Sequence, residues 1–189
     1  SREALERRDI PKKALIIGGG ATGAEIAYLW NAYGVDVTIV EMLPHLLPLE
    51  DEEVSRQLER SFDRQGINFL TSAQVTGSTV SDAGVSLEVA HGGETTALEA
   101  DLVLIAAGVR PNTDGLGLEE NGVALDRGFV TVDSSMASNV PGVYAIGDVT
   151  GIMLLAHVAQ AQGVLAVERI AGLDSPDIDY DVMPRATYC

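Results

Sequence analysis

The 189-residue sequence predicts an α/β fold: a parallel sheet with helical crossovers, an antiparallel β-meander, and then a second segment of short strands and one long helix. Three observations lead to this prediction. Short apolar runs end at glycines or acids, as buried parallel strands do. Apolar residues recur at helical spacing after the first runs, and the spacing changes to two in the middle of the chain.

The first elements are a strand, a helix and a strand. Residues 14–17 form a short apolar run, and residues 35–40 form a second, β-branched run. Between them, residues 22–33 carry apolar side chains at helical spacing, and Gly34 follows where a helix C-terminal glycine belongs. This order predicts one right-handed βαβ unit.

A second helix and the meander come next. The acidic residues 50–53 favour a helix N-terminus, and Gly66 ends that helix. Residues 67–70 predict a third strand. Alternating apolar and polar residues between turn signals predict an antiparallel meander over about 74–98, and residues 101–106 return as an apolar strand.

The second segment begins at about residue 116. Short strands are predicted at 128–132 and 143–146, and a long apolar helix at 156–171, closed by Gly172. Gly163 inside this helix costs about 1 kcal/mol relative to alanine. A close packing partner is therefore expected there, inside or outside the chain.

Composition excludes several classes of function. The net charge of −16 repels phosphate backbones and anionic lipid, so general nucleic-acid or membrane-surface binding is not expected. The one cysteine, Cys189, leaves no internal disulfide, Cys/Cys metal pair or CxxC motif. No apolar run approaches the roughly 20 residues that span a bilayer. The cytoplasm is the expected location, and a start without methionine leads us to expect a fragment.

A glycine-rich turn carries the first functional motif. The segment from Gly18 to Gly23 has the pattern G-x-G-x-x-G and lies between a predicted strand and a predicted helix. The first glycine allows a tight turn, the second (Gly20) lets the backbone approach a pyrophosphate, and the third allows close helix–strand packing. A Rossmann-like dinucleotide site is expected, because the helix N-terminus also supplies N–H groups. An ordinary glycine-rich turn is the alternative.

Glu41 strengthens the nucleotide interpretation. It ends the second strand, where a carboxylate can accept hydrogen bonds from the adenosine ribose hydroxyls. This position favours NAD over NADP, because a ribose phosphate would be repelled and the next residues offer no arginine. A solvated carboxylate at a strand end is the alternative. Glu25, which the predicted boundaries put on the first turn of the helix, is awkward beside a pyrophosphate but favourable for the helix dipole.

Two later clusters have the same form, a strand that runs into glycine. Gly108 follows the 101–106 strand, at the sheet edge where ligands of open α/β sheets bind. Asp148 follows Gly147, where a carboxylate would suit sugar or polyol hydroxyls. A turn with a helix-capping aspartate is the alternative for Asp148.

Together, the segments IIGGGATGAEIA, AAGVRPNT and VPGVYAIGDVTGIMLLAHVAQAQG resemble the pyridine nucleotide-disulfide oxidoreductases, and the dihydrolipoamide dehydrogenases in particular. The resemblance covers the whole chain. It implies a linker at 1–10, an NAD domain at 11–113, the second half of an FAD domain at 114–172, and a connection at 173–189 to a dimerisation domain.

The resemblance also implies the cofactor-binding residues. Those expected on NAD are Gly18, Gly19, Gly20, Ala21, Thr22, Gly23, Ala24, Glu25, Glu41, Val75 and Gly108. Glu25 would sit between nicotinamide and flavin. Those expected on FAD are Asp148 at the ribityl chain and Leu154, Leu155, Ala156 and His157 at the flavin ring.

The family's redox-active cysteine pair and catalytic His-Glu pair have no counterpart in this sequence, so no catalytic residue and no activity of the chain by itself are expected. The longer protein would pass electrons between dihydrolipoyl groups and NAD through FAD. It would be a homodimer and a component of a 2-oxoacid dehydrogenase complex. The alternatives are a related flavin NADH oxidase or ferredoxin reductase, and a non-catalytic NAD-binding module.

Overall fold

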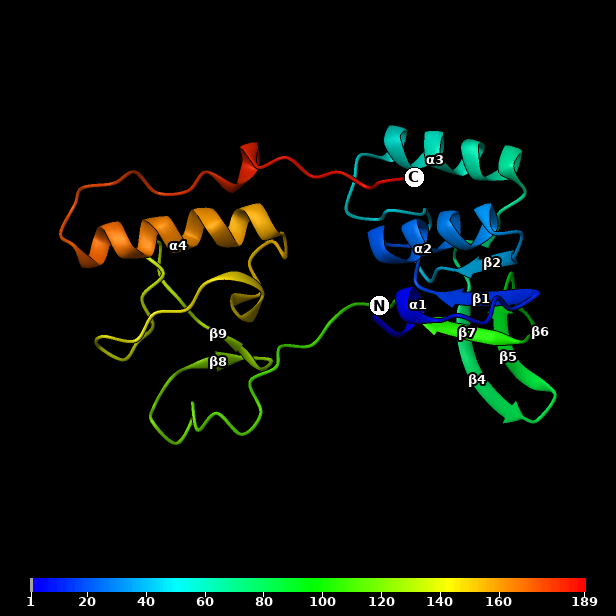
Figure 1. Cartoon of the computed structure of the whole chain (residues 1–189), viewed down its shortest axis with the longest axis horizontal. Coiled ribbons are helices and arrows are strands. Elements are labelled where there is room, and N and C mark those ends of the chain that lie inside the picture. Colours follow the sequence, from blue (N-terminus) through cyan, green and yellow to red (C-terminus); the bar gives the residue numbers. More distant parts are fainter. Residues whose placement is uncertain (1) are drawn as a thin grey trace. The chain divides into compact units, whose positions relative to one another are not determined.

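The computed structural model describes the backbone of residues 2–189, and it forms two compact units. The first unit contains the residues up to Val109 together with Ala186–Cys189, and the second contains Arg110–Arg185. Figure 1 labels the helices and strands of both units.

A parallel sheet forms the centre of the first unit. Its strands stand in the order β3-β2-β1-β7, with every neighbouring pair parallel. Their bounds are Lys13–Ile17 for β1, Asp36–Val40 for β2, Asn68–Leu70 for β3 and Leu102–Ile105 for β7. The glycine turn follows β1, which lies between β2 and β7, so segments from both neighbours meet it at the carboxyl edge.

Helices cover one face of this sheet and the meander covers the other, as Figure 1 shows. The helices are α2 (Ala21–Ala32) and α3 (Glu52–Gln65), and the antiparallel meander comprises β4 (Gln74–Ser81), β5 (Gly84–His91) and β6 (Glu94–Ala100). Alternate residues of a strand point to opposite faces. Ile16 accordingly joins the core under the helices, and its neighbour Leu15 joins the core under the meander.

The second unit consists mainly of turns, two very short strands and one long helix. Leu125–Asp126 (β8) pairs antiparallel with Phe129–Val130 (β9), and α4 spans Ala156–Ile170. Gly147–Thr150 and Tyr180–Val182 form 3₁₀ turns, η1 and η2.

The fold class is confirmed, and several details need correction. No strand forms at 143–146: among the described residues, that segment makes only an isolated bridge between Ala137 and Tyr144. The 128–132 strand shortens to β9, and a short helix, α1 (Arg2–Glu6), lies where only a linker was expected. A Cβ on Gly163 would lie 3.2 Å from Ile146 Cδ1, so the packing partner of this glycine is inside the chain.

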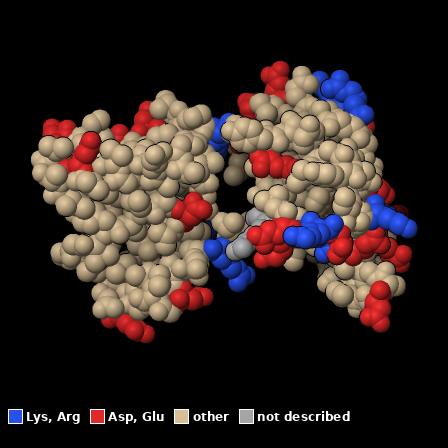
Figure 2. Space-filling view, in the orientation of Figure 1, with Lys and Arg blue, Asp and Glu red and all other residues tan. Residues whose placement is uncertain are grey.

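Figure 2 shows acidic side chains spread over both units on the face in view, in agreement with the net charge of −16. Across the described part of the chain, no helix has both the length and the apolarity that crossing a membrane requires.

Candidate functional site

The glycine turn between β1 and α2 is shaped by contacts that exclude side chains. Gly18 has φ +104°, and a Cβ there would lie 2.6 Å from the carbonyl oxygen of Ala106. A Cβ on Gly23 would lie 1.9 Å from the carbonyl oxygen of Gly18. At Gly20, by contrast, a Cβ would meet no atom of the chain within 4 Å. Two of the motif glycines are therefore needed for packing, while Gly20 borders open space.

Glu41 is bound directly to the glycine turn. Its carboxylate accepts the Gly19 N–H at 2.5 Å through Oε2 and the Leu43 N–H at 2.8 Å through Oε1. The residue is only 7% exposed, so the alternative of a solvated carboxylate at a strand end is wrong. A carboxylate has about four acceptor positions. Glu41 therefore holds the turn and keeps acceptor capacity for a ligand hydroxyl.

The N-terminus of α2 has no side-chain cap. Its N-cap residue is Gly20, whereas α3 is capped by Asp51, whose Oδ1 accepts the Glu53 N–H at 2.8 Å. The first N–H groups of a helix have no partner within the helix and carry the positive end of its dipole. An anion at the start of α2 would meet these donors without displacing a capping side chain.

Glu25 does not stand in the first turn of α2, because the helix begins at Ala21 and its first turn contains no acidic residue. The predicted start was one residue late, and this put Glu25 too close to the phosphate donors. The Glu25 carboxylate instead accepts the Tyr188 N–H at 2.9 Å.

A cavity of about 390 Å³ opens beside the glycine turn. Its walls come from the glycine turn, the β2–α3 loop, the start of the meander and the segment after β7, and the lining residues are Ile17, Gly18, Gly20, Ala21, Val40, Glu41, Met42, Leu43, Leu47, Pro48, Leu49, Glu50, Ala73, Val75, Ala106, Ala107 and Gly108. The only charged residues among them are Glu41 and Glu50. His45 is not in the lining, and its two ring nitrogens lie 3.1 Å from Glu52 and 3.4 Å from Glu59.

The structure brings six of the expected NAD residues together in this lining, namely Gly18, Gly20, Ala21, Glu41, Val75 and Gly108. The other five do not line the cavity. A Cβ on Gly19 would meet Leu46 and Glu41, and Gly23 and Ala24 are buried in the helix–sheet contact. Thr22 and Glu25 lie on α2 outside the lining.

In the second unit, the turn that carries Asp148 is held from both sides. The Gly147 N–H donates to Oε1 of the fully buried Gln162 at 2.6 Å, and the Thr150 hydroxyl donates to the Gly147 carbonyl at 2.8 Å. Gln162 Nε2 donates in turn to the Tyr180 hydroxyl at 3.0 Å. Asp148 follows this braced glycine and is itself exposed.

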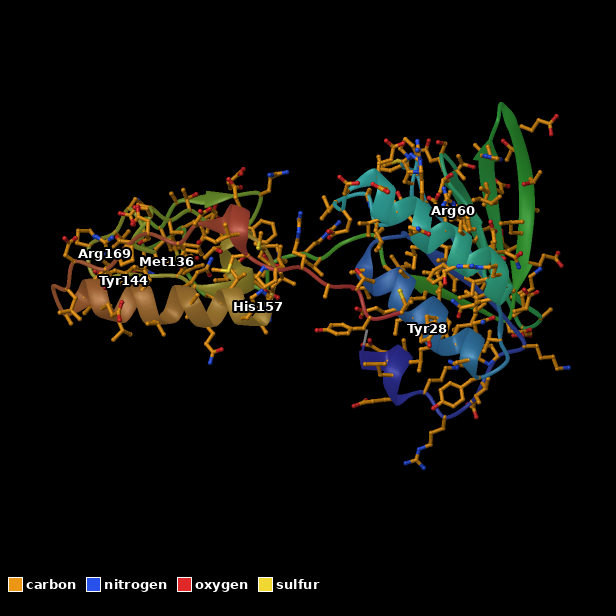
Figure 3. All side chains as sticks on the ribbon, turned by 90° about the horizontal axis from the view of Figure 1, so that it is seen from above. Tyr28, Arg60, Met136, Tyr144, His157 and Arg169 are labelled. Carbon is orange, nitrogen blue, oxygen red and sulfur yellow. The ribbon has the colours of Figure 1, made fainter. Side chains whose placement is uncertain are left out.

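The remaining predicted residues, Leu154–His157, surround the start of α4. This helix begins at Ala156, and its N-cap, Leu155, provides no side-chain cap. Figure 3 shows His157 near one end of α4 and Arg169 near the other. The His157 ring nitrogen Nε2 lies 3.0 Å from the Pro184 carbonyl oxygen. The backbone N–H groups at this helix end could approach a ligand, as they could at α2.

Sequence reasoning missed the buried polar residues that hold these turns. Ser55, 1% exposed, donates to the Leu47 carbonyl at 3.2 Å, and Leu47 donates its N–H to the Gly19 carbonyl at 2.8 Å. Gln162 is the corresponding residue of the second unit. A polar residue on the inward face of a predicted helix was the available signal, because such groups are buried only when they have partners.

Comparison with known proteins identifies the family. The family model described as pyridine nucleotide-disulphide oxidoreductase matches residues 1–163. The chain belongs to this family. Its expected fold and its two cofactors, NAD and FAD, are thereby confirmed at the level of the family.

Relatives in this oxidoreductase family include the dihydrolipoyl dehydrogenases of Mycobacterium leprae and Chlorobaculum tepidum. The first is 47% identical over 189 residues, covering 99% of this chain and 40% of the relative. The second is 44% identical, covering 100% of this chain and 40% of the relative. The chain thus spans about two fifths of the length of the curated relatives that it matches.

Two solved structures have a fold similar to that of this chain. The crystal structure of LpdA from Mycobacterium tuberculosis superposes with a TM-score of 0.89 at 33% identity, covering 99% of this chain and 40% of that one. The HOCl-induced flavoprotein disulfide reductase RclA from Escherichia coli gives a TM-score of 0.82 at 27% identity, covering 92% and 39%.

Proposed function

We propose that this chain is the NAD(H)-binding portion of an FAD-dependent dihydrolipoyl dehydrogenase. The cavity beside the glycine turn is the observation that carries the proposal. Its lining includes the buried carboxylate of Glu41, which is placed to bind ribose hydroxyls, and the uncapped N-terminus of α2. The segment 11–113 is the NAD domain in this proposal. Residues 114–172 are the second half of an FAD domain, and residues 173–189 lead to a dimerisation domain.

The NAD site uses the residues predicted above, in two parts. Glu41 accepts the adenosine ribose hydroxyls, and the N–H groups around Gly20 and Ala21 receive the pyrophosphate. Val75 and Gly108 also line the cavity. Of the remaining predicted NAD residues, Gly19, Gly23 and Ala24 allow the close packing of the turn and the helix, and Thr22 and Glu25 lie on α2 outside the lining.

Selectivity for NAD follows from the charges of the lining. A phosphate on the adenosine ribose would lie next to the Glu41 carboxylate. Among the described side chains, no Lys or Arg lines the cavity to neutralise it. Two like charges in contact repel strongly where water is excluded.

The FAD contacts belong to the second unit. Asp148 binds the ribityl hydroxyls, and Leu154, Leu155, Ala156 and His157 bring the start of α4 to the flavin ring. The hydrogen bonds that join Gln162 and Thr150 to Gly147 support this role, because a rigid turn presents a carboxylate at a defined position. Bound NAD and FAD supply the hydride and electron transfer, and the chain supplies binding and orientation.

The longer protein, in this proposal, passes electrons between dihydrolipoyl groups and NAD as a cytoplasmic homodimer, within a 2-oxoacid dehydrogenase complex. A flavin NADH oxidase or ferredoxin reductase is the alternative enzyme. Its nucleotide site would be the same, and its activity with NADH and lipoamide would differ.

A free-standing NAD-binding module is the alternative from another class. Such a module should present no apolar helix face to solvent. On α4, however, Val164, Val167 and Ile170 are 57%, 66% and 59% exposed. Exposed apolar surface of this kind marks a site of contact with other protein. This observation favours the flavoenzyme.

Titration of the purified chain with NADH and separately with NADPH tests the proposal. Binding is measured by nucleotide fluorescence or by heat, and we expect saturable NADH binding and clearly weaker NADPH binding. Glu41→Gln should reduce the difference in affinity between NADH and NADPH. Glu94 is an exposed acid of the meander, so Glu94→Gln should leave that difference unchanged. NADPH binding as tight as NADH binding would refute the selectivity argument. A folded chain that binds neither nucleotide would refute the site.

A further inference from the structure

Ser55 lies outside the cavity and is nevertheless connected to the glycine turn through one residue. Its hydroxyl donates to the Leu47 carbonyl at 3.2 Å, and the Leu47 N–H donates to the Gly19 carbonyl at 2.8 Å. Ser55 is 1% exposed and Leu47 is 4% exposed, so water does not compete for these bonds. Ser55 is not among the residues that line the cavity.

Leu47 needs this support because of its backbone conformation. Its φ is +50°, in the left-handed region that residues other than glycine rarely adopt. A strained residue keeps such a conformation only when its surroundings hold it. The constraint comes from both ends of the residue: the Leu47 carbonyl accepts the Ser55 hydroxyl and also the Glu50 N–H, at 2.9 Å, and the Leu47 N–H donates to the Gly19 carbonyl.

The consequence for the glycine turn follows from the planarity of the peptide group. The carbonyl of Gly19 and the N–H of Gly20 belong to one trans peptide and point in opposite directions. When Leu47 holds the carbonyl, the Gly20 N–H is directed away from Leu47. Among the described hydrogen bonds, none uses this N–H. The space where a Gly20 side chain would stand is also open.

The geometry points to Ser55 as a positioning residue for the nucleotide pyrophosphate. Through Leu47 it fixes the orientation of the Gly19–Gly20 peptide, so that the Gly20 N–H is presented to the phosphates together with the uncapped start of α2. Glu41 fixes the preceding peptide in the same manner, by accepting the Gly19 N–H. This inference rests on the proposed NAD site and assigns it a residue that does not touch the ligand.

The test compares ADP, which carries the pyrophosphate, with adenosine, which lacks it. Dissociation constants for both are measured by NMR titration for the wild-type chain and for Ser55→Ala. We expect the preference for ADP over adenosine to fall by about fivefold, the equivalent of roughly one neutral hydrogen bond, with adenosine binding unchanged. A serine that served only the fold would weaken both ligands together.

Ser61→Ala is the matched control. Ser61 lies on the same helix, and its hydroxyl accepts a hydrogen bond from Gln65 at 3.0 Å, so its removal should leave the ADP preference unchanged. An unchanged preference in Ser55→Ala, or an equal fall in Ser61→Ala, would overturn the role of Ser55. A wild-type chain that binds ADP no better than adenosine would instead refute the NAD site itself. Should Ser55→Ala fail to fold, Ser55→Cys keeps a side chain of similar size with a weaker donor, and the same comparison applies.

Discussion

Adding one methyl group at two glycines of the same turn should have two different effects, a loss of stability at Gly23 and a loss of NADH binding at Gly20. A Cβ on Gly23 would lie 1.9 Å from the Gly18 carbonyl oxygen, and real Cβ atoms keep at least 3.0 Å from such an atom. Helix and turn would have to separate by about 1.1 Å, the difference between these distances. Overpacking of a rigid contact costs typically 1–3 kcal/mol, and the obstacle here is backbone, so Gly23→Ala should cost about 3 kcal/mol.

Gly20→Ala meets no such obstacle. The φ of Gly20 is −69°, which alanine adopts freely, and its Cβ would contact nothing within 4 Å. The weaker capping by alanine and the smaller entropy of the unfolded chain oppose each other, so stability should change by less than about 1 kcal/mol. The methyl group would, however, occupy the space proposed for the pyrophosphate. We expect NADH binding at least about tenfold weaker, or 1.4 kcal/mol.

Thermal unfolding and NADH titration of both variants separate these effects. Gly23→Ala should lower the melting temperature by roughly 6–12 °C, and Gly20→Ala by no more than roughly 4 °C. Wild-type NADH affinity in Gly20→Ala would refute the assigned role of Gly20. A melting temperature of Gly23→Ala equal to that of the wild type would refute the packing argument.

Three further predictions concern buried and charged side chains. Glu41→Gln loses one acceptor of a backbone N–H, so the free energy of unfolding measured by denaturant titration should fall by roughly 1.5–3 kcal/mol. Gln162→Met leaves a buried backbone N–H without its acceptor, and the same assay should report a loss of roughly 1–3 kcal/mol. Backbone N–H groups of Lys13 and then Lys12 hold the pKa of Asp101 below its usual range. The stability from that carboxylate is present above the unfolded pKa, near 4, and is lost as the pH falls through the folded value. Below about pH 4, the free energy of unfolding should therefore fall less steeply with falling pH in Asp101→Asn than in the wild type.

Most of the first unit could be predicted from the sequence, because its elements are marked by strong local signals. The α3 helix ends at Gly66 in the left-handed conformation, as a C-terminal glycine predicts. The meander strands lie where the period of two and the turn residues indicated. Local sequence fixes such features, since each depends on neighbours a few residues away.

Predictions for the second unit were less accurate, because its structure depends more on contacts between residues that are distant in the sequence. The apolar run at 143–146 suggested a strand, but a strand needs a partner, and only Tyr144 makes a bridge, to Ala137. Only part of this run is packed: Ile146 lies against Gly163 of α4 and is still 42% exposed. Pairing across long sequence separation is a tertiary property, so the run could not distinguish a strand from a packed loop.

The site shows a similar division between what is local and what is not. The spacing of glycines and Glu41 predicted a nucleotide motif, but it gave no hint that Glu41 binds the Gly19 N–H or that Ser55 acts through Leu47. These contacts join residues from different elements.

Buried polar side chains recur at both candidate cofactor turns. Glu41 and Ser55 act on the Gly18–Gly23 turn, directly and through Leu47, while Thr150 and Gln162 hold Gly147 beside Asp148. Burial of a polar group costs free energy unless a hydrogen bond compensates, and each of these four side chains makes a compensating bond to a backbone group at or next to a turn. An apolar side chain could fill the same space but could not orient a peptide group. Their presence is therefore better explained by the orientation of the turns than by the stability of the core.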